Sequence, residues 1–162
     1  MQHRQGIGPA RFAALITAFA TAIIAAPTIA EPLGAEVTGT QVTITITNMR
    51  NTDGMVRACM TRDEDRFPRC QDATQGYRTV VPAGEATVLH FENVAPGTYA
   101  IALLHDENGN GRADRALGMM PREGFGFSRD APVRMGPPDF EEAAISIGSS
   151  PFQQTIRMRY ML

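Results

Sequence analysis

The chain has 162 residues, of which 43% are hydrophobic and 20% are charged, and its formal net charge is −2. This composition excludes a disordered chain, which would carry fewer apolar residues and more net charge, and the length favours one domain with at most a short appendage. All 15 basic residues are arginine and 17 residues are acidic, so the basic excess typical of nucleic-acid-binding modules is absent and we expect no nucleic acid partner.

The first 30 residues have the three parts of a secretory signal peptide. Arg4 and Arg11 form the basic start, residues 12–26 are apolar, and Ala30 is a small residue at the expected cleavage position. An uncleaved anchor is the alternative, but the apolar stretch is shorter than the roughly 20 residues of a spanning helix. We therefore predict a cleaved signal peptide over 1–30 and a periplasmic or secreted domain over 31–162, with no membrane span after cleavage. That domain keeps 13 arginines and all 17 acids, a net charge of −4.

Two cysteines remain in the exported domain, Cys59 and Cys70. Exported domains fold in oxidising compartments, where an even number of cysteines predicts disulfides. A catalytic pair would favour the Cys-x-x-Cys spacing, and a metal pair would need two further soft ligands. We therefore predict a structural disulfide between Cys59 and Cys70 that closes the 60–69 loop.

Alternating hydrophobic and polar residues indicate strands along the exported domain. Val42, Ile44 and Ile46 alternate with threonines, which is typical of a half-buried strand over 41–47. Asn-Thr-Asp-Gly at 51–54 predicts a hairpin to a second strand over 55–60. Further strands are expected over 77–81, 85–91, 98–105, 141–147 and 154–160, and the apolar run 101–104 indicates a central strand covered on both faces.

About seven short strands, with no convincing amphipathic helix after residue 30, predict an all-β domain, an immunoglobulin-like β-sandwich. Residues 106–139 are rich in glycine and proline and show no periodicity. We expect them to form a long loop region with one short strand at most, and loops of this length are usually functional or disordered.

The sharpest local pattern begins at Asp106 and has the spacing of a calcium-binding loop. Counted from Asp106 as position one, oxygen-bearing side chains fall at positions one, three, five and nine: Asp106, Asn108, Asn110 and Asp114. The carbonyl of Arg112 would face inward at position seven. A hard cation needs six to eight oxygens from a short segment, which is why alternate residues carry them. The alternative is an Asn- and Gly-rich turn whose side chains bond their own backbone.

Position twelve of this pattern is Leu117, which has no carboxylate to offer. Calcium loops usually place a bidentate glutamate there. A distant acid (Glu123, Asp139 or Glu142) or water would therefore have to complete the shell of a structural calcium ion.

Two further features suggest a ligand surface. Phe125, Phe127 and Phe140, together with Glu123, could floor a shallow surface, although packing of these rings onto the sandwich is the interpretation that we favour. His105 invites a catalytic interpretation, but no serine lies in a nucleophile-elbow context. A structural role for His105 at a strand end is therefore favoured.

Four motifs in a fixed order resemble those of a known family. Residues 96–99 form a Pro-Gly-x-Tyr turn, common in prealbumin-like β-sandwiches, and three further motifs follow: His-Asp-Glu-Asn-Gly-Asn-Gly at 105–111, Glu-Gly-Phe-Gly-Phe-Ser at 123–128 and Gly-Pro-Pro-x-Phe at 136–140. Together they resemble the DUF2141 family of exported bacterial proteins, over residues 42–158. The resemblance implies a secreted, prealbumin-like and immunoglobulin-like sandwich, and it implies no particular biochemical activity. The cysteine pair is not part of the family's pattern, so the disulfide prediction depends on compartment and spacing alone.

These observations favour a non-enzymatic, monomeric binding or structural accessory module whose long loop region contacts a protein or glycan partner. A hydrolase or other enzyme that uses His105, Asp106 and Glu123 around a cation is one alternative. A cell-surface polysaccharide binder is another, and it requires Phe125, Phe127 and Phe140 to be exposed in one plane.

Overall fold

The computed structural model describes residues 39–70, 76–116 and 120–162. The predicted signal peptide and its cleavage position lie outside the described residues, as does Leu117. Within the described part of the chain, no helix is long and apolar enough to cross a membrane. Strands are the main element there, so the prediction of an all-β domain is confirmed.

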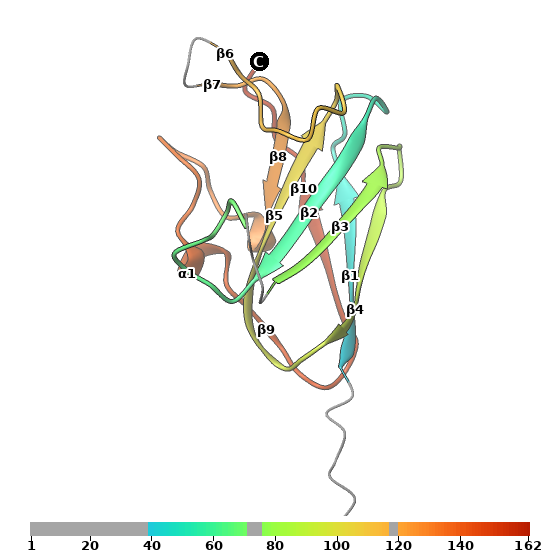
Figure 1. Cartoon of the computed structure of the whole chain (residues 1–162), viewed down its shortest axis with the longest axis vertical. Helices are drawn as coiled ribbons and strands as arrows, with labels where there is room; N and C mark the ends of the chain where they lie inside the picture. The colour runs from blue at the N-terminus through green and yellow to red at the C-terminus, as the bar shows by residue number, and fades with distance from the viewer. Residues whose placement is uncertain (1–38, 71–75, 117–119) are drawn as a thin grey trace, which may run out of the picture. The chain divides into compact units, whose positions relative to one another are not determined.

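Two sheets pack face to face as a β-sandwich (Figure 1). One sheet has the strand order β10-β1-β4, and β1 is parallel to β10 and antiparallel to β4. The other has the order β3-β2-β5-β8, and β9 pairs with the first residues of β5. The strands are β1 Thr40–Thr47, β2 Met55–Thr61, β3 Gly76–Pro82, β4 Val88–Val94, β5 Gly97–Asp106, β8 Gly124–Phe127, β9 Ile145–Ile147 and β10 Phe152–Arg157. The predicted sandwich is therefore confirmed.

Period-two alternation buries one face of each sheet between the two. Val42, Ile44 and Ile46 of β1 are buried, as the sequence predicts, while Thr45 and Thr47 face solvent. The facing sheet contributes Val56, Ala58, Met60, Tyr99, Ile101 and Leu103. Each fully buried side chain of this kind contributes about 1.5–3 kcal/mol, so this core fixes the register of the strands and the places where they end.

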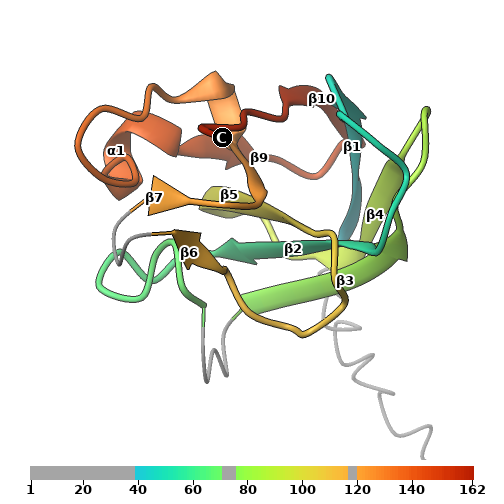
Figure 2. The same cartoon turned by 90° about the horizontal axis from the view of Figure 1, so that it is seen from above.

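The central strand β5 is covered on both faces, and this prediction is also confirmed. Tyr99, Ile101 and Leu103 face the core between the sheets, whereas Ala100 faces a second apolar cluster on the other side of the sheet. That cluster also contains Phe127, Ala131, Phe140 and Ala143. The short helix α1, which contributes two of them, lies on the far side of the molecule from β4 (Figure 2).

The predicted hairpin at 51–54 is wrong, although the local turn is present. The Asn51 side chain accepts the backbone N–H of Asp53 at 3.0 Å, and Gly54 has a φ of 66°. A Cβ at Gly54 would lie 2.1 Å from the carbonyl oxygen of Asp106, so only glycine fits. However, β1 pairs with β4 and β10 while β2 pairs with β3 and β5, so this connection crosses between the sheets. Turn residues specify a local bend, but long-range burial decides which strands pair.

A helical turn, α1 (Phe140–Ala143), replaces the first part of the strand predicted over 141–147. Only β9 is extended there. Asp139 precedes the helix, and the Glu142 carboxylate accepts the backbone N–H of Asp139 at 3.2 Å. This contact belongs to a capping box, in which an acidic residue three positions after the N-cap satisfies a free backbone donor. The capping signal was present in the sequence and prevailed over the alternation.

The 106–139 region is more ordered than predicted. Besides β8, it contains the two-residue strands β6 (Arg115–Ala116) and β7 (Met120–Pro121), which pair with each other, and a 3₁₀ turn over Ser128–Asp130. The hydroxyl of Ser128 accepts the backbone N–H of Ile101 at 2.9 Å and donates to the carbonyl of Ala143. These two bonds fasten the end of this region to β5.

The predicted disulfide between Cys59 and Cys70 is present. Cys59 lies in β2, and Cys70 is buried at the end of the following loop. Phe67 of that loop makes edge-to-face contacts with Phe127 and Phe140, with ring centroids 5.8 and 6.0 Å apart. The disulfide therefore holds an aromatic side chain of the loop against the second apolar cluster.

We predict that the double variant Cys59→Ser/Cys70→Ser unfolds at lower denaturant concentration. Loss of a cross-link over a loop of this size costs about 2–3 kcal/mol, mainly because the unfolded chain gains freedom. Urea unfolding followed by tyrosine fluorescence measures the change, and the reduced wild-type protein should unfold at the same midpoint as the variant. An unchanged midpoint in both would contradict a stabilising role for the disulfide.

Candidate cation site at the end of the central strand

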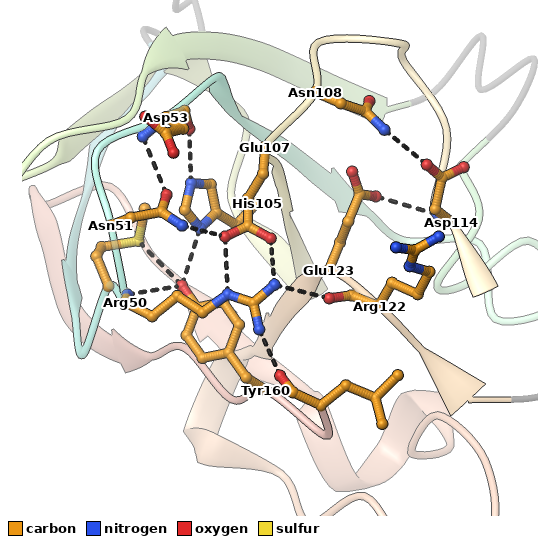
Figure 3. Close-up of polar contacts among 12 residues, drawn as sticks. Arg50, Asn51, Asp53, His105, Glu107, Asn108, Asp114, Arg122, Glu123 and Tyr160 are labelled. Carbon is orange, nitrogen blue, oxygen red and sulfur yellow. Dashed lines mark hydrogen bonds and ion pairs between the residues drawn. The ribbon is translucent and has the colours of Figure 1, made fainter. Parts of the chain in front are cut away.

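Four segments that are distant in sequence meet where β5 ends (Figure 3). The loop after β5 carries Asn108 and Asp114, and the residue before β8 is Glu123. The connection between β1 and β2 contributes Arg50, and the segment after β10 contributes Tyr160. The sandwich therefore brings the predicted calcium loop next to one of the three acids that were expected to complete its shell.

Asp106 ends β5 with no exposed surface. Its Oδ1 accepts the backbone N–H of Asn110 at 3.0 Å, and its Oδ2 accepts the backbone N–H of Gly111 at 2.9 Å and Nε of Arg57 at 2.6 Å. Burial alone would raise the pKa of Asp106, but Arg57 and the two backbone donors outweigh it and hold that pKa below its ordinary value. Asp106 is therefore a carboxylate around which the loop folds.

The two asparagines of the loop bond both to the backbone and to Asp114. Oδ1 of Asn108 accepts the N–H of Asn110 at 3.0 Å, and Oδ1 of Asn110 accepts the N–H of Arg112 at 2.8 Å. Their side-chain nitrogens donate to Oδ2 of Asp114 at 2.7 and 2.9 Å. The turn bonds of the alternative interpretation are thus present, and they gather the predicted side chains of the loop around one point.

Glu123 is only 4% exposed and faces this loop (Figure 3). Its Oε2 accepts the backbone N–H of Asp114 at 3.1 Å, whereas its Oε1 is buried and has no hydrogen-bond partner among the described residues. Burial raises the pKa of Glu123, and the neighbouring carboxylates of Asp106, Asp114 and Glu107 raise it further, while the Asp114 N–H acts in the opposite direction. A buried carboxylate oxygen without a partner is a costly feature that calls for an explanation.

A cavity of about 270 Å³ borders the loop and Glu123. It is lined by Arg50, Glu107, Asn108, Asp114, Arg122 and Glu123. Within the described residues, no group of three or more His, Cys, Asp or Glu side chains is arranged as a metal site. The lining includes the carboxylates of Glu107, Asp114 and Glu123 and the side-chain amide of Asn108.

Asp139 and Glu142, the other two acids considered for the missing position, lie elsewhere. Asp139 lines a different cavity beside Phe67 and Pro68, and Glu142 bonds the backbone of Asp139. Of the three acids, only Glu123 is brought to the loop.

His105 is fully buried, and both of its ring nitrogens are engaged. Nε2 lies 2.8 Å from the carbonyl oxygen of Asp53, which can only accept, so Nε2 carries the proton. Nδ1 lies 2.9 Å from the hydroxyl of Tyr160. Burial raises the pKa of that hydroxyl, so Tyr160 stays protonated and can donate to Nδ1. These contacts give His105 a structural role.

The five residues of the predicted ligand surface do not form one exposed face. Phe127 and Phe140 are buried in the second apolar cluster, and Phe125 is half-buried against Phe127 with ring centroids 6.1 Å apart. His105 and Glu123 are buried at the end of β5. The aromatic rings pack onto the sandwich because the loop region must cover the outer face of β5.

Sequence reasoning missed several residues of this site, namely Arg50, Arg57, Glu107 and Tyr160. Arg57 lies in β2, whose register with β5 places it opposite Leu104 and next to Asp106. Arg50 and Glu107 form an ion pair across 57 positions of sequence. Only the pairing of distant segments brings these side chains together, so no local pattern could have revealed them.

A comparison with protein families shows which family the sequence matches. The sequence profile described as "Uncharacterized protein conserved in bacteria (DUF2141)" matches residues 44–155. No curated protein and no solved structure matches the chain.

We predict that Asp106→Asn destabilises the protein in a pH-dependent way. A carboxyl whose pKa is lowered by folding contributes stability that is present above its unfolded pKa of about 3.9 and is lost as the pH falls through the lower folded value. D106N should therefore reduce the free energy of unfolding by about 2 kcal/mol at pH 7, and its difference from wild type should shrink toward pH 2.

Urea unfolding at several pH values measures this difference. Glu64→Gln, at an exposed position of the disulfide loop, serves as the control and should match wild type at pH 7. A D106N difference that is the same at pH 7 and pH 2 would contradict the prediction.

Proposed function

The chain belongs to the DUF2141 family of proteins conserved in bacteria, and from this membership and the site geometry we propose that it is an exported, non-enzymatic accessory module whose 106–114 loop binds calcium. The loop then presents a fixed surface to a protein or glycan partner. The observation that carries the proposal is the buried, unpartnered Oε1 of Glu123 beside the loop. A cation would satisfy this oxygen and would offset the repulsion among the carboxylates around it.

The loop and Glu123 together supply the oxygens that calcium prefers. The loop offers side-chain oxygens of Asp106, Asn108, Asn110 and Asp114 and the carbonyl of Arg112. Glu123 directly precedes β8 and takes the role that a glutamate at position twelve plays in a continuous loop. Calcium accepts six to eight oxygens in flexible geometry, whereas magnesium demands a near-ideal octahedron. An assembled shell of this kind therefore favours calcium.

Binding requires a local rearrangement of the two asparagines. Their amide nitrogens now donate to Asp114, and rotation of each amide about its last bond would turn its oxygen toward the cation instead. Such terminal torsions are soft. This rotation breaks the bonds from the backbone N–H groups of Asn110 and Arg112 to the two amide oxygens. The bonds from the N–H groups of Asn110 and Gly111 to Asp106 can persist and hold the path of the loop.

The charges around the site indicate modest affinity. Two arginines, Arg50 and Arg57, each bind a carboxylate of this region and reduce its net negative charge. Calcium affinity decreases when the ligands carry less negative charge. Extracellular calcium modules bind with Kd of about 10⁻⁴–10⁻³ M. A site of that strength would be loaded outside the cell, which agrees with the proposed export.

The two alternative functions have less support in the geometry. An enzyme that uses His105 needs a ring nitrogen that can reach a substrate, but both nitrogens are bound inside the protein. A polysaccharide binder needs Phe125, Phe127 and Phe140 in one exposed plane, and two of these rings are buried. The module is therefore proposed to act through the exposed side of its loop, as a monomer.

We predict that the purified protein, after treatment with a chelator, binds calcium more tightly than magnesium and that Glu123→Gln raises the calcium Kd at least about tenfold. The physical reason is the loss of a charged carboxylate ligand. Isothermal titration calorimetry measures both. Glu142→Gln is the matched control, because it changes an acid from the same candidate set that lies outside the loop. Absence of calcium binding below about 10 mM would refute the proposal.

We also predict that calcium stabilises the fold. At a free concentration of ten times Kd, binding adds about 1.4 kcal/mol, which corresponds to a rise in Tm of about 4–6 °C for a domain of this size. Asp114→Ala should remove this rise and change Tm little in a chelator. An enzyme would instead show loss of turnover at unchanged Tm. A calcium-dependent rise in D114A equal to that of wild type would contradict the assignment of Asp114.

A further inference from the structure

Arg50 connects the two halves of the proposed calcium site. Its Nε donates to Oε1 of Glu107 at 2.8 Å, and a terminal nitrogen bonds Oε2 of the same carboxylate. That terminal nitrogen also donates to the carbonyl of Arg122 at 2.8 Å. Glu107 directly follows Asp106 at the start of the loop, and Arg122 directly precedes Glu123. One guanidinium thus spans the loop and the segment that carries the missing ligand (Figure 3).

We infer that Arg50 is a positioning residue of the calcium site, which holds Glu123 against the loop without contacting the cation. This inference depends on the calcium site proposed above. Glu123 comes from a different part of the chain than the loop, so its distance from the other ligands is set by whatever fixes its backbone. The bond to the Arg122 carbonyl fixes that backbone one residue away.

Contacts with Tyr160 fix the position of Arg50. Its guanidinium lies over the ring of Tyr160, 4.6 Å from the centroid, and its backbone N–H donates to the Tyr160 hydroxyl at 3.2 Å. The same hydroxyl is bound by Nδ1 of His105. Gly124 permits this close packing, since a Cβ there would lie 2.3 Å from the Tyr160 ring. His105 therefore orients Tyr160, and the ring of Tyr160 packs against the guanidinium of Arg50.

The ion pair also fixes the position of the Glu107 carboxylate. Arg50 lowers the pKa of Glu107 through its hydrogen bonds, against the opposite effect of burial, and the side chain of Asn51 bonds the same carboxylate. Both oxygens of Glu107 are therefore occupied by donors. A planar guanidinium can bind this carboxylate with two parallel bonds and reach a carbonyl as well, whereas a lysine ammonium is a point charge without that fork.

A matched control residue lies on another loop of the same molecule. Arg62 lies over the ring of Tyr99, also 4.6 Å from the centroid, and it donates to the carbonyls of Ala95 and Pro96. These carbonyls belong to the turn before β5, whereas the calcium site follows the end of β5. Arg62→Ala therefore removes a ring contact and carbonyl hydrogen bonds, as Arg50→Ala does, but it removes no ion pair with Glu107 and acts at the opposite end of the strand.

The test measures calcium affinity of the purified protein by calorimetry, with terbium(III) as a tighter-binding probe where calcium binding is weak. Arg50→Ala should raise the Kd about tenfold or more, and Arg62→Ala should change it less than twofold. Arg50→Lys should give an intermediate loss, because it keeps the charge and loses the fork. In a Glu123→Gln background, Arg50→Ala should cause no further loss, since it acts through Glu123. A general loss of stability would not produce this dependence on Glu123.

Each outcome decides between the two proposals. If wild type binds calcium but Arg50→Ala and Arg62→Ala have the same Kd, the positioning role is overturned and the calcium site stands. Equal losses from Arg50→Ala with and without Glu123 would also overturn it. If Arg50→Ala does not fold, Arg50→Lys and Glu107→Gln carry the same test, each with and without Glu123→Gln. If wild type binds neither cation, the calcium site fails and the inference fails with it.

Discussion

The end of β5 imposes the constraint on which the whole candidate site depends. His105 and Asp106 are polar, adjacent and fully buried, and a buried polar atom without a partner costs about 1–3 kcal/mol or more if it is charged. Asp106 satisfies its oxygens with the backbone of its own loop and with Arg57. His105 satisfies its nitrogens with Asp53 and Tyr160. The path of the loop and the packing of the C-terminal segment both follow from these needs.

The two apolar clusters explain why this end of the sandwich can be so polar. The core between the sheets and the cluster around Phe127 and Phe140 hold β5 from both faces, and the Cys59–Cys70 disulfide secures the loop that covers the second cluster. The two clusters therefore bury both faces of β5 without hydrophobic side chains from the 107–114 loop. That loop can therefore carry polar side chains instead of hydrophobic ones. Binding residues on loops that a rigid scaffold positions are typical of binding modules.

The features that sequence predicted are those with a local physical cause. Alternation of Val42, Ile44 and Ile46 with threonines sets the faces of β1, and export together with spacing pointed to the disulfide. Where a second local signal competed, the prediction failed: the Asp139–Glu142 capping box formed α1 within an alternating stretch. Where pairing is long-range, local signals gave no answer, so the turn before Gly54 was assigned to a hairpin although it links two sheets.

The candidate site also has a part with a local sequence signal and a part that depends on long-range pairing. The spacing of Asp106, Asn108, Asn110 and Asp114 is a local pattern and could be recognised, whereas the choice of Glu123 over Asp139 and Glu142 required the fold.

The charge balance at the end of β5 connects the scaffold to the proposed function. Asp106, Glu107, Asp114 and Glu123 lie close enough for three of them to raise the pKa of the fourth. Among the residues that the structure describes, two arginines, Arg50 and Arg57, form ion pairs with them. The arginines bind Glu107 and Asp106, so the uncompensated charge is concentrated on Asp114 and Glu123. Both of these residues line the cavity. A divalent cation between them would supply the missing positive charge and the missing partner of Glu123 Oε1 in one step.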